Sequence, residues 1–151
     1  MENMLKQELF VTVSHCGANG VMTADRLLEF FQDMASRHGE GLGVGLDSMT
    51  ARNRFWLTVR SRARIFRAPR LGETVTGATW PAAPGLLRCD RYYTVTGADG
   101  SLLADGRTEW AVFDTEAGRV TSPKGIFPEG LEYRTDTAGG GAFEKLPTDF
   151  A

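Results

Sequence analysis

Three carboxylates recur at an interval of four residues in the first third of the chain: Asp25, Glu29 and Asp33. On a helix this interval places the side chains in one stripe along the surface. A carboxylate held beside a reacting centre can act as a general base for an attacking water. Glu29, with Asp25 as the alternative, is therefore the candidate base. The competing interpretation is a solvated helix face on which Asp33 pairs with Arg37.

The pair Asn19-Gly20 forms a predicted turn before this helix, and the backbone amides of Val21, Met22 and Thr23 follow it. Amides at the start of a helix have no intrahelical acceptor and can bind a negatively charged oxygen. They are candidates for an oxyanion site, in which Asn19 would orient water or substrate. A plain turn leading into a helix explains the same residues equally well.

His15 and Cys16 precede the turn and could supply a base or a nucleophile. A histidine in a turn is more often solvated or hydrogen-bonded to the loop, and a lone cysteine more often packs as a small apolar residue. His38 falls near the apolar face of the predicted helix, where a core histidine with satisfied hydrogen bonds is the favoured interpretation.

Arg60, Arg62 and Arg64 alternate along a predicted strand, so they should project from one face. A phosphate or an acidic carrier protein would suit such a face. Cross-strand acidic partners on a solvated face are the competing interpretation. A nucleic-acid partner is not expected, because the formal net charge is -2 and no stacking-aromatic motif of the RNA-binding kind is present.

Two cysteines and two histidines, without a CxxC or HExxH pairing, do not predict a metal site, a cofactor or a disulfide framework. The first ten residues do not resemble a signal peptide. No apolar run approaches the about 20 residues that span a bilayer, so no membrane association is expected. The sequence is interpreted as that of a cytoplasmic protein.

One long helix and several strands must position these groups. Thr23 is the predicted N-cap, Asp25 lies in the first turn, and glycines from Gly39 onward end the helix. The predicted apolar face consists of Leu27, Leu28, Phe31, Met34 and Ala35. Strands are predicted at 9–13, 56–66, 73–80, 86–96 and 102–114, with a short extended segment at 119–120. On the second strand, Leu57, Val59, Ala63 and Ile65 should face the core.

The element order predicts an α+β fold in which a curved antiparallel sheet of five to six strands wraps the helix. A single domain should occupy residues 1–122. The Pro- and Gly-rich residues 123–151 have the composition of a tail or linker-like arm. One helix cannot cover a sheet of this size, so a homodimer or higher homo-oligomer should bury the remaining apolar surface.

Short motifs occur in order over roughly residues 8 to 123 and resemble the acyl-acyl-carrier-protein thioesterases, within the 4-hydroxybenzoyl-CoA thioesterase-like hotdog superfamily. The matching stretches are Asn19-Gly20, Phe31-Gln32-Asp33-Met34-Ala35 with His38, Leu42-Gly43-Val44-Gly45, Trp56-Leu57 with Arg60, Arg67-Ala68-Pro69-Arg70-Leu71-Gly72-Glu73, Thr79-Trp80, Arg91-Tyr92-Tyr93, Asp99-Gly100 and Trp110.

The resemblance implies a hotdog fold and hydrolysis of an acyl thioester carried by acyl carrier protein or coenzyme A. Family members often carry two hotdog repeats, and this chain resembles the first, which shapes the acyl pocket. Relatives often have an aspartate where this chain has Gly17. That departure leaves open a non-catalytic acyl-binding protein. A hotdog dehydratase or isomerase is the other alternative, in which His15 would pair with Asp25 or Glu29 across the dimer.

Overall fold

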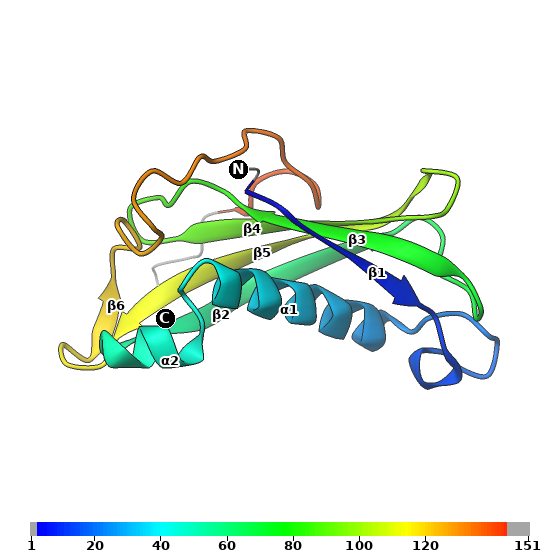
Figure 1. Cartoon of the computed structure of the whole chain (residues 1–151), viewed down its shortest axis with the longest axis horizontal. Coiled ribbons are helices and arrows are strands. Elements are labelled where there is room, and N and C mark those ends of the chain that lie inside the picture. Colours follow the sequence, from blue (N-terminus) through cyan, green and yellow to red (C-terminus); the bar gives the residue numbers. More distant parts are fainter. Residues whose placement is uncertain (1–2, 145–151) are drawn as a thin grey trace, which may run out of the picture.

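A computed structural model of the 151-residue chain describes residues 3–144. Two helices and six strands follow in the order β1 (Leu5–Phe10), α1 (Ala24–Gly41), α2 (Leu46–Ala51), β2 (Arg54–Ile65), β3 (Thr74–Pro81), β4 (Cys89–Thr96), β5 (Leu102–Asp114) and β6 (Arg119–Thr121), with a 3-10 turn at Val13–His15. The strands form one antiparallel sheet in the order β1-β3-β4-β5-β2, and β6 pairs with β5. Figure 1 shows α1 lying along one face of this curved sheet, which we call the inner face.

The long helix is confirmed, because α1 begins at Ala24 with Thr23 as its N-cap residue and ends at Gly41. Its buried face differs from the prediction. Leu28 is 39% exposed, whereas Phe30 is buried. The buried side chains are Leu27, Phe30, Phe31, Met34 and His38, together with Gly39. Leu28 lies at the edge of this stripe, since each helical residue turns the chain by about 100°.

Two glycines let α1 approach the sheet closely. A Cβ atom added to Gly77 would lie 2.6 Å from the Met34 Sδ atom, and one added to Gly106 would lie 2.5 Å from the ring of Phe31. The Phe31 ring stacks on Tyr93 with 4.7 Å between the centroids. The helix therefore packs directly on the backbone of β3 and β5, and the main core forms between them.

The strand β2 departs from the predicted alternation, and the cause is a β-bulge between Thr58 and Arg60. The bulge places Leu57 on the same face as Arg60. Leu57 and Ile65, which were predicted to be core residues, are 36% and 43% exposed. The prediction was wrong for Leu57, which the bulge turns to the face of Arg60, and for Ile65 near the end of this edge strand, whereas Ala63 packs against the main core.

The helix α2 was not predicted. A six-residue segment with Met49 as its one buried side chain gives no helical periodicity that a sequence pattern can detect. The predicted strands, by contrast, all have counterparts. The first of them lies at Leu5–Phe10 rather than at 9–13, and β5 has the predicted bounds.

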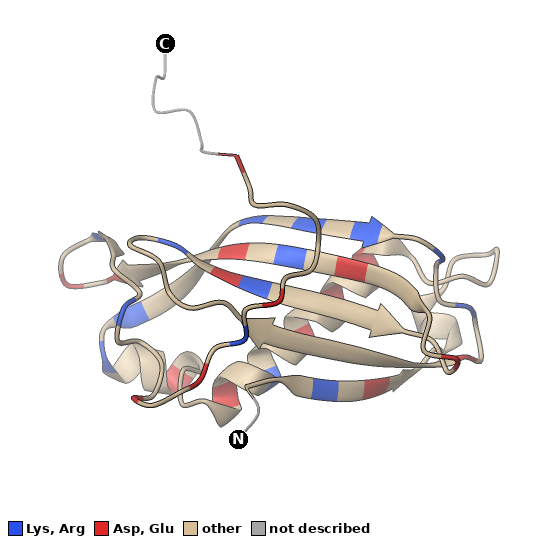
Figure 2. Cartoon of the chain, turned by 90° about the horizontal axis from the view of Figure 1, so that it is seen from above, with Lys and Arg blue, Asp and Glu red and all other residues tan. Residues whose placement is uncertain are grey.

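The segment from Ser122 to Glu144 contains no helix or strand, yet it packs against the rest of the chain. Ile126 and Phe127 are buried beside α2, and the indole Nε1 of Trp80 donates a hydrogen bond of 3.0 Å to the carbonyl of Asp136. Figure 2 shows this segment crossing the face of the sheet opposite to α1, which we call the outer face. Residues 145–151 of the predicted tail lie outside the described residues.

Candidate functional site

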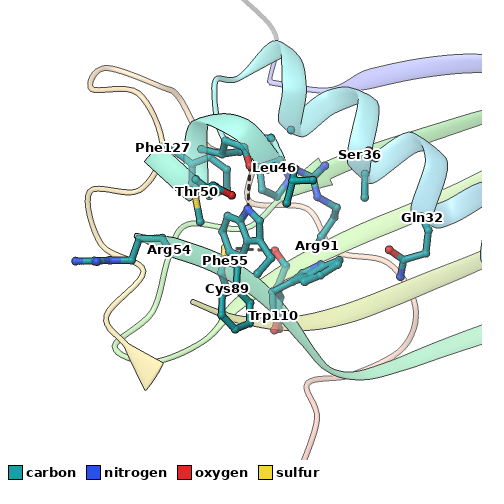
Figure 3. A pocket seen from close by; sticks show the side chains of 18 of the residues that line it. Gln32, Ser36, Leu46, Thr50, Arg54, Phe55, Cys89, Arg91, Trp110 and Phe127 are labelled. Atoms are coloured by element: carbon teal, nitrogen blue, oxygen red, sulfur yellow. Dashed lines mark hydrogen bonds between the residues drawn. The ribbon is translucent and has the colours of Figure 1, made fainter. Parts of the chain in front are cut away.

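A cavity of about 680 Å³ opens between the C-terminal half of α1, the helix α2 and the inner face of the sheet (Figure 3). This volume falls in the range of small-molecule binding sites. The side chains at its rim are exposed: Gln32, Ser36, Leu46 and Thr50. The side chains at its floor are buried: Val44, Met49, Pro81, Cys89, Arg91 and Phe127.

Aromatic side chains give the cavity rigid walls. The Trp56 indole donates a hydrogen bond of 3.1 Å to the carbonyl of Val44, which ties β2 to the loop before α2. Its ring contacts Trp110 edge-on, with 6.1 Å between the centroids, and Phe127 at 5.9 Å. Burial raises the pKa of the Cys89 thiol to about 12, so this side chain is an uncharged part of the apolar floor.

Arg91 is the one charged side chain in that floor. It is 6% exposed, and its Nη1 donates to Nδ1 of His38 at 2.9 Å and to Oγ1 of Thr79 at 3.2 Å. Burial, with the charge of Arg91 as a second cause, lowers the pKa of His38 to about 4. His38 is therefore neutral at pH 7 and accepts this hydrogen bond, in agreement with the prediction of a satisfied core histidine.

The predicted carboxylate stripe lies on the exposed side of α1. Asp25, Glu29 and Asp33 are all exposed, and Glu29 accepts a hydrogen bond of 2.8 Å from Arg26. Gln32 at the cavity rim follows Glu29 by three residues, which is about one helical turn. The stripe therefore leads along the helix to the mouth of the cavity. The predicted pairing of Asp33 with Arg37 is not among the ion pairs of residues 3–144.

The three amides predicted to hold an oxyanion each have an acceptor within the chain. The amide of Val21 donates to Oδ1 of Asn19 at 3.3 Å. Those of Met22 and Thr23 donate to the carbonyls of Pro69 and His15 at 2.7 and 3.0 Å. No oxyanion site is open at these amides in this conformation. They also lie at the end of α1 remote from the cavity, since the helix spans 18 residues and about 27 Å.

His15 and Cys16 are held by local structure. The Nδ1 atom of His15 accepts the backbone amide of Thr12 at 2.9 Å. Within residues 3–144 no hydrogen bond or ion pair joins His15 to Asp25 or Glu29. The half-buried Cys16 packs against the main core. The dehydratase alternative, which pairs such groups across a dimer, stays a prediction.

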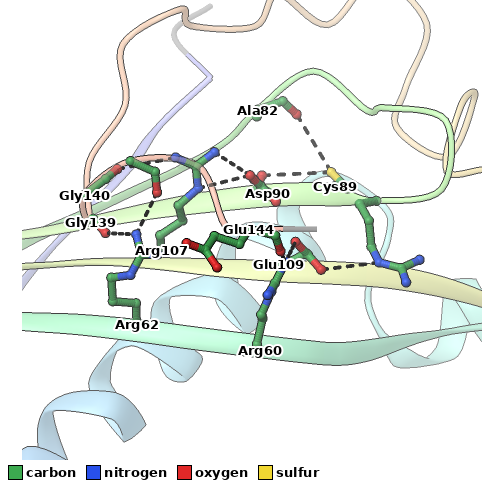
Figure 4. A network of polar contacts seen from close by, with 12 residues as sticks. Arg60, Arg62, Ala82, Cys89, Asp90, Arg107, Glu109, Gly139, Gly140 and Glu144 are labelled. Atoms are coloured by element: carbon green, nitrogen blue, oxygen red, sulfur yellow. Dashed lines mark hydrogen bonds and ion pairs between the residues drawn. The ribbon is translucent and has the colours of Figure 1, made fainter. Parts of the chain in front are cut away.

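The predicted arginine row lies on the outer face, away from the cavity, and its members bind acidic side chains or the tail; Figure 4 shows Arg60 and Arg62. Arg64 binds both carboxylate oxygens of Asp105 at 2.8 and 2.6 Å. Arg60 pairs with Glu109 at 3.3 Å, and Arg62 donates to the carbonyls at positions 139 and 141. The Phe143 ring covers Arg60 and Arg62. These contacts fit the interpretation of cross-strand partners, and a phosphate-binding role stays a prediction.

The sequence reasoning missed Arg91 as a site residue. A signal was present, because Arg91 alternates along β4 with Cys89 and Tyr93, which makes it an inward-facing charge.

Among residues 3–144, no cluster of three or more His, Cys, Asp or Glu side chains could hold a metal ion. The same part of the chain has no helix that is long and apolar enough to cross a membrane.

Comparisons with known proteins agree with this architecture. The family model "Acyl-ACP thioesterase N-terminal domain" matches residues 2–125. Oleoyl-acyl carrier protein thioesterase 1 of Arabidopsis thaliana is 20% identical over 122 residues, which cover 76% of this chain and 34% of the plant protein. The chain thus spans about a third of the length of the curated relatives that it matches.

Solved structures show the same fold. An acyl-ACP thioesterase from Bacteroides thetaiotaomicron superposes with a TM-score of 0.76 at 19% identity, covering 89% of this chain and 58% of that chain. The Staphylococcus aureus protein SAV2348, solved in complex with CoA, has a TM-score of 0.73 at 17% identity and covers 79% and 75% of the two chains. The predicted α+β hotdog fold is confirmed.

Proposed function

Because this chain belongs to the acyl-ACP thioesterase family, we propose that it binds the acyl group of an acyl thioester in the cavity and hydrolyses the thioester to a free acid and a thiol. The observation that carries this proposal is the cavity itself. It is about 680 Å³ in volume, its floor is largely apolar and buried, and its rim adjoins the exposed face of α1. An apolar chain gains free energy by leaving water for such a floor.

The thioester would lie at the rim, between Gln32 and Ser36, with the acyl chain directed inward. The carrier, acyl carrier protein or coenzyme A, would then remain outside on the exposed side of α1. The family assignment supports the former, and the CoA complex of the Staphylococcus aureus structure supports the latter. Both cysteines are free thiols, which suits a cytoplasmic location for this activity.

Glu29 is the proposed general base, with Asp25 and His15 as further candidates, and Asn19 would orient water or substrate. Glu29 lies about one turn from the rim residue Gln32, so a water held between them would face a thioester at the mouth. The amides of Val21, Met22 and Thr23 would serve as oxyanion donors only after exchanging their present acceptors.

A second hotdog unit is proposed to lie along β2, as a second copy of this chain. This strand has 12 residues and pairs only with β5 among the strands of the described chain. Its unpaired backbone edge and the exposed Leu57 and Ile65 would be buried by such a partner. The partner would also cover the exposed carboxylate stripe of α1. A general base on this stripe would then lie in a site from which most water is excluded.

A non-catalytic acyl-binding role is the second candidate. It is favoured by the acceptors that already occupy the three predicted oxyanion amides. Under this alternative the cavity would bind the acyl chain, and hydrolysis would need groups that this chain does not supply.

The test is thiol release from a panel of acyl-carrier-protein and acyl-CoA substrates, with Glu29→Gln beside the wild type. Glu132→Gln, which changes an exposed carboxylate in the tail, is the matched control. Loss of turnover in Glu29→Gln alone supports hydrolysis with its base on α1. Turnover that survives in both variants moves the chemistry toward His15 and Asn19. Acyl binding without turnover supports the second candidate.

A further inference from the structure

Arg91 carries a positive charge at the cavity floor that no acidic side chain of the described chain balances. None of the ion pairs within residues 3–144 includes Arg91. The neighbouring Asp90 lies on the outer face, where it pairs with Arg107 at 2.6 Å. The two partners of Arg91, His38 and Thr79, are both uncharged.

The charge itself is permanent, because a guanidinium does not lose its proton at any physiological pH. Its desolvation is costly unless an anion or enough hydrogen-bond acceptors replace water. Both acceptors of Arg91 bind Nη1. Among the described residues, Nε and Nη2 have no acceptor, and the side chain lines the cavity. The N–H groups of Nε and Nη2 are therefore available to donate to a ligand.

Beyond His38 and Thr79, the buried side chains beside Arg91 at the cavity floor also carry no charge. Val44, Met49, Pro81 and Phe127 form the rest of the floor together with the Cys89 thiol. In such a setting one charged group determines which ligand end is accepted, because a charge-assisted pair is strong where water is excluded. A methyl end would leave the guanidinium donors unpaired, whereas a carboxylate would accept two of them side by side.

We propose that Arg91 makes the cavity floor an anion site, and that the preferred acyl group carries a carboxylate at the end remote from its thioester. The substrate class would be the hemithioesters of dicarboxylic acids rather than plain fatty acyl thioesters. This inference rests on the proposed function, since it assumes that the acyl group enters the cavity from the rim at Gln32 and Ser36.

Binding of non-hydrolysable amide analogues tests the inference without requiring turnover. The analogues are N-acyl cysteamine amides of matched chain length whose far end is a methyl, a carboxamide or a carboxylate. Isothermal titration with the full chain should show the carboxylate binding about tenfold more tightly than the carboxamide of the same shape. Arg91→Met should remove this preference and Arg91→Lys should keep part of it. Arg119→Met, an exposed arginine on β6, should leave the preference unchanged.

The outcomes separate the two proposals. Tighter binding of the carboxylate that depends on Arg91 supports the anion site. Equal binding of the carboxylate and carboxamide, or the same preference in Arg91→Met, overturns it while leaving an acyl cavity in place. If no analogue of any end group binds, the acyl cavity itself is contradicted. The comparison of carboxylate and carboxamide analogues on the wild-type protein tests the anion site even if Arg91→Met does not fold.

Discussion

The Nη1 atom of Arg91 lies 2.9 Å from Nδ1 of His38, so a strand of the sheet and the central helix meet through a charged hydrogen bond at the cavity floor. Both residues are buried, at 6% and 8% exposure. This contact orients the guanidinium, and burial together with the charge of Arg91 lowers the pKa of His38 and keeps it neutral. The stability of the protein and the ligands that its cavity accepts should therefore both depend on this pair.

The first prediction concerns pH. The pKa of His38 is lowered to about 4 in the folded protein from 6.5, so the unfolded chain binds its proton first as the pH falls. Above pH 6.5 His38 is neutral in both states and does not lower the free energy of unfolding. Between pH 6.5 and 4 protonation of His38 in the unfolded chain lowers that free energy progressively. The loss should amount to about 1–3 kcal/mol. Urea unfolding across this range should show a steeper decline for the wild type than for His38→Gln. Parallel curves would contradict the buried neutral histidine.

A second prediction compares two buried arginines. Arg91→Met removes a charge that no acidic side chain of the described residues balances, so the free energy of unfolding should fall by less than about 1 kcal/mol or rise. Arg107→Met should lower it by about 1–3 kcal/mol, since the Asp90 carboxylate loses its partner. Denaturant titrations of both variants provide the measurement. A greater loss in Arg91→Met would contradict this prediction. It would show that the hydrogen bonds to His38 and Thr79 stabilise the protein by more than burial of the charge destabilises it.

Close packing of α1 gives a third prediction. Gly106→Ala should lower the free energy of unfolding by about 1–3 kcal/mol, because the new methyl group would meet Phe31 at 2.5 Å. The matched control is Gly41→Ala in the last turn of the same helix, where an added Cβ meets no atom within 4 Å. That variant should be neutral or more stable. Equal effects at the two positions would contradict the close approach of helix and sheet.

Self-association is the subject of a fourth prediction. If a second copy binds along β2, Ile65→Lys should shift sedimentation toward the monomer, because a charge replaces an apolar side chain that is 43% exposed. Leu86→Lys changes a residue that is 76% exposed outside the strands and should have no effect. A wild-type protein that remains monomeric at all concentrations would rule out a homodimer.

Local patterns predicted the elements that carry strong local signals. The Thr23 N-cap marked the start of α1, and the alternation of residues 102–114 marked β5. Interactions between distant segments could not be predicted in this way. The bulge beside Arg60 depends on pairing with β5, and the helix at Met49 depends on burial beside Phe127. The same reason explains the missed role of Arg91, whose partners His38 and Thr79 lie on other elements.

The exposed groups at the start of α1 show a related limit. The sequence places Asn19 and Thr23 before the helix, as an oxyanion site would require. Whether the amide of Met22 is free depends on Pro69, which lies far away in the chain and accepts it. Local spacing predicts which groups are near one another, but only the tertiary fold determines which of them remain unpaired.

The central claim, that an acyl thioester is hydrolysed with its acyl chain in the cavity, is tested most directly by thiol release as a function of chain length in wild type and Ser36→Trp. The indole would fill the rim, whereas Arg37→Trp, at an exposed neighbouring position, would leave it open. We expect Ser36→Trp to lower kcat/KM at least about tenfold for long acyl groups, with little change for acetyl. Equal kcat/KM values for long chains in the wild type and Ser36→Trp would contradict the claim.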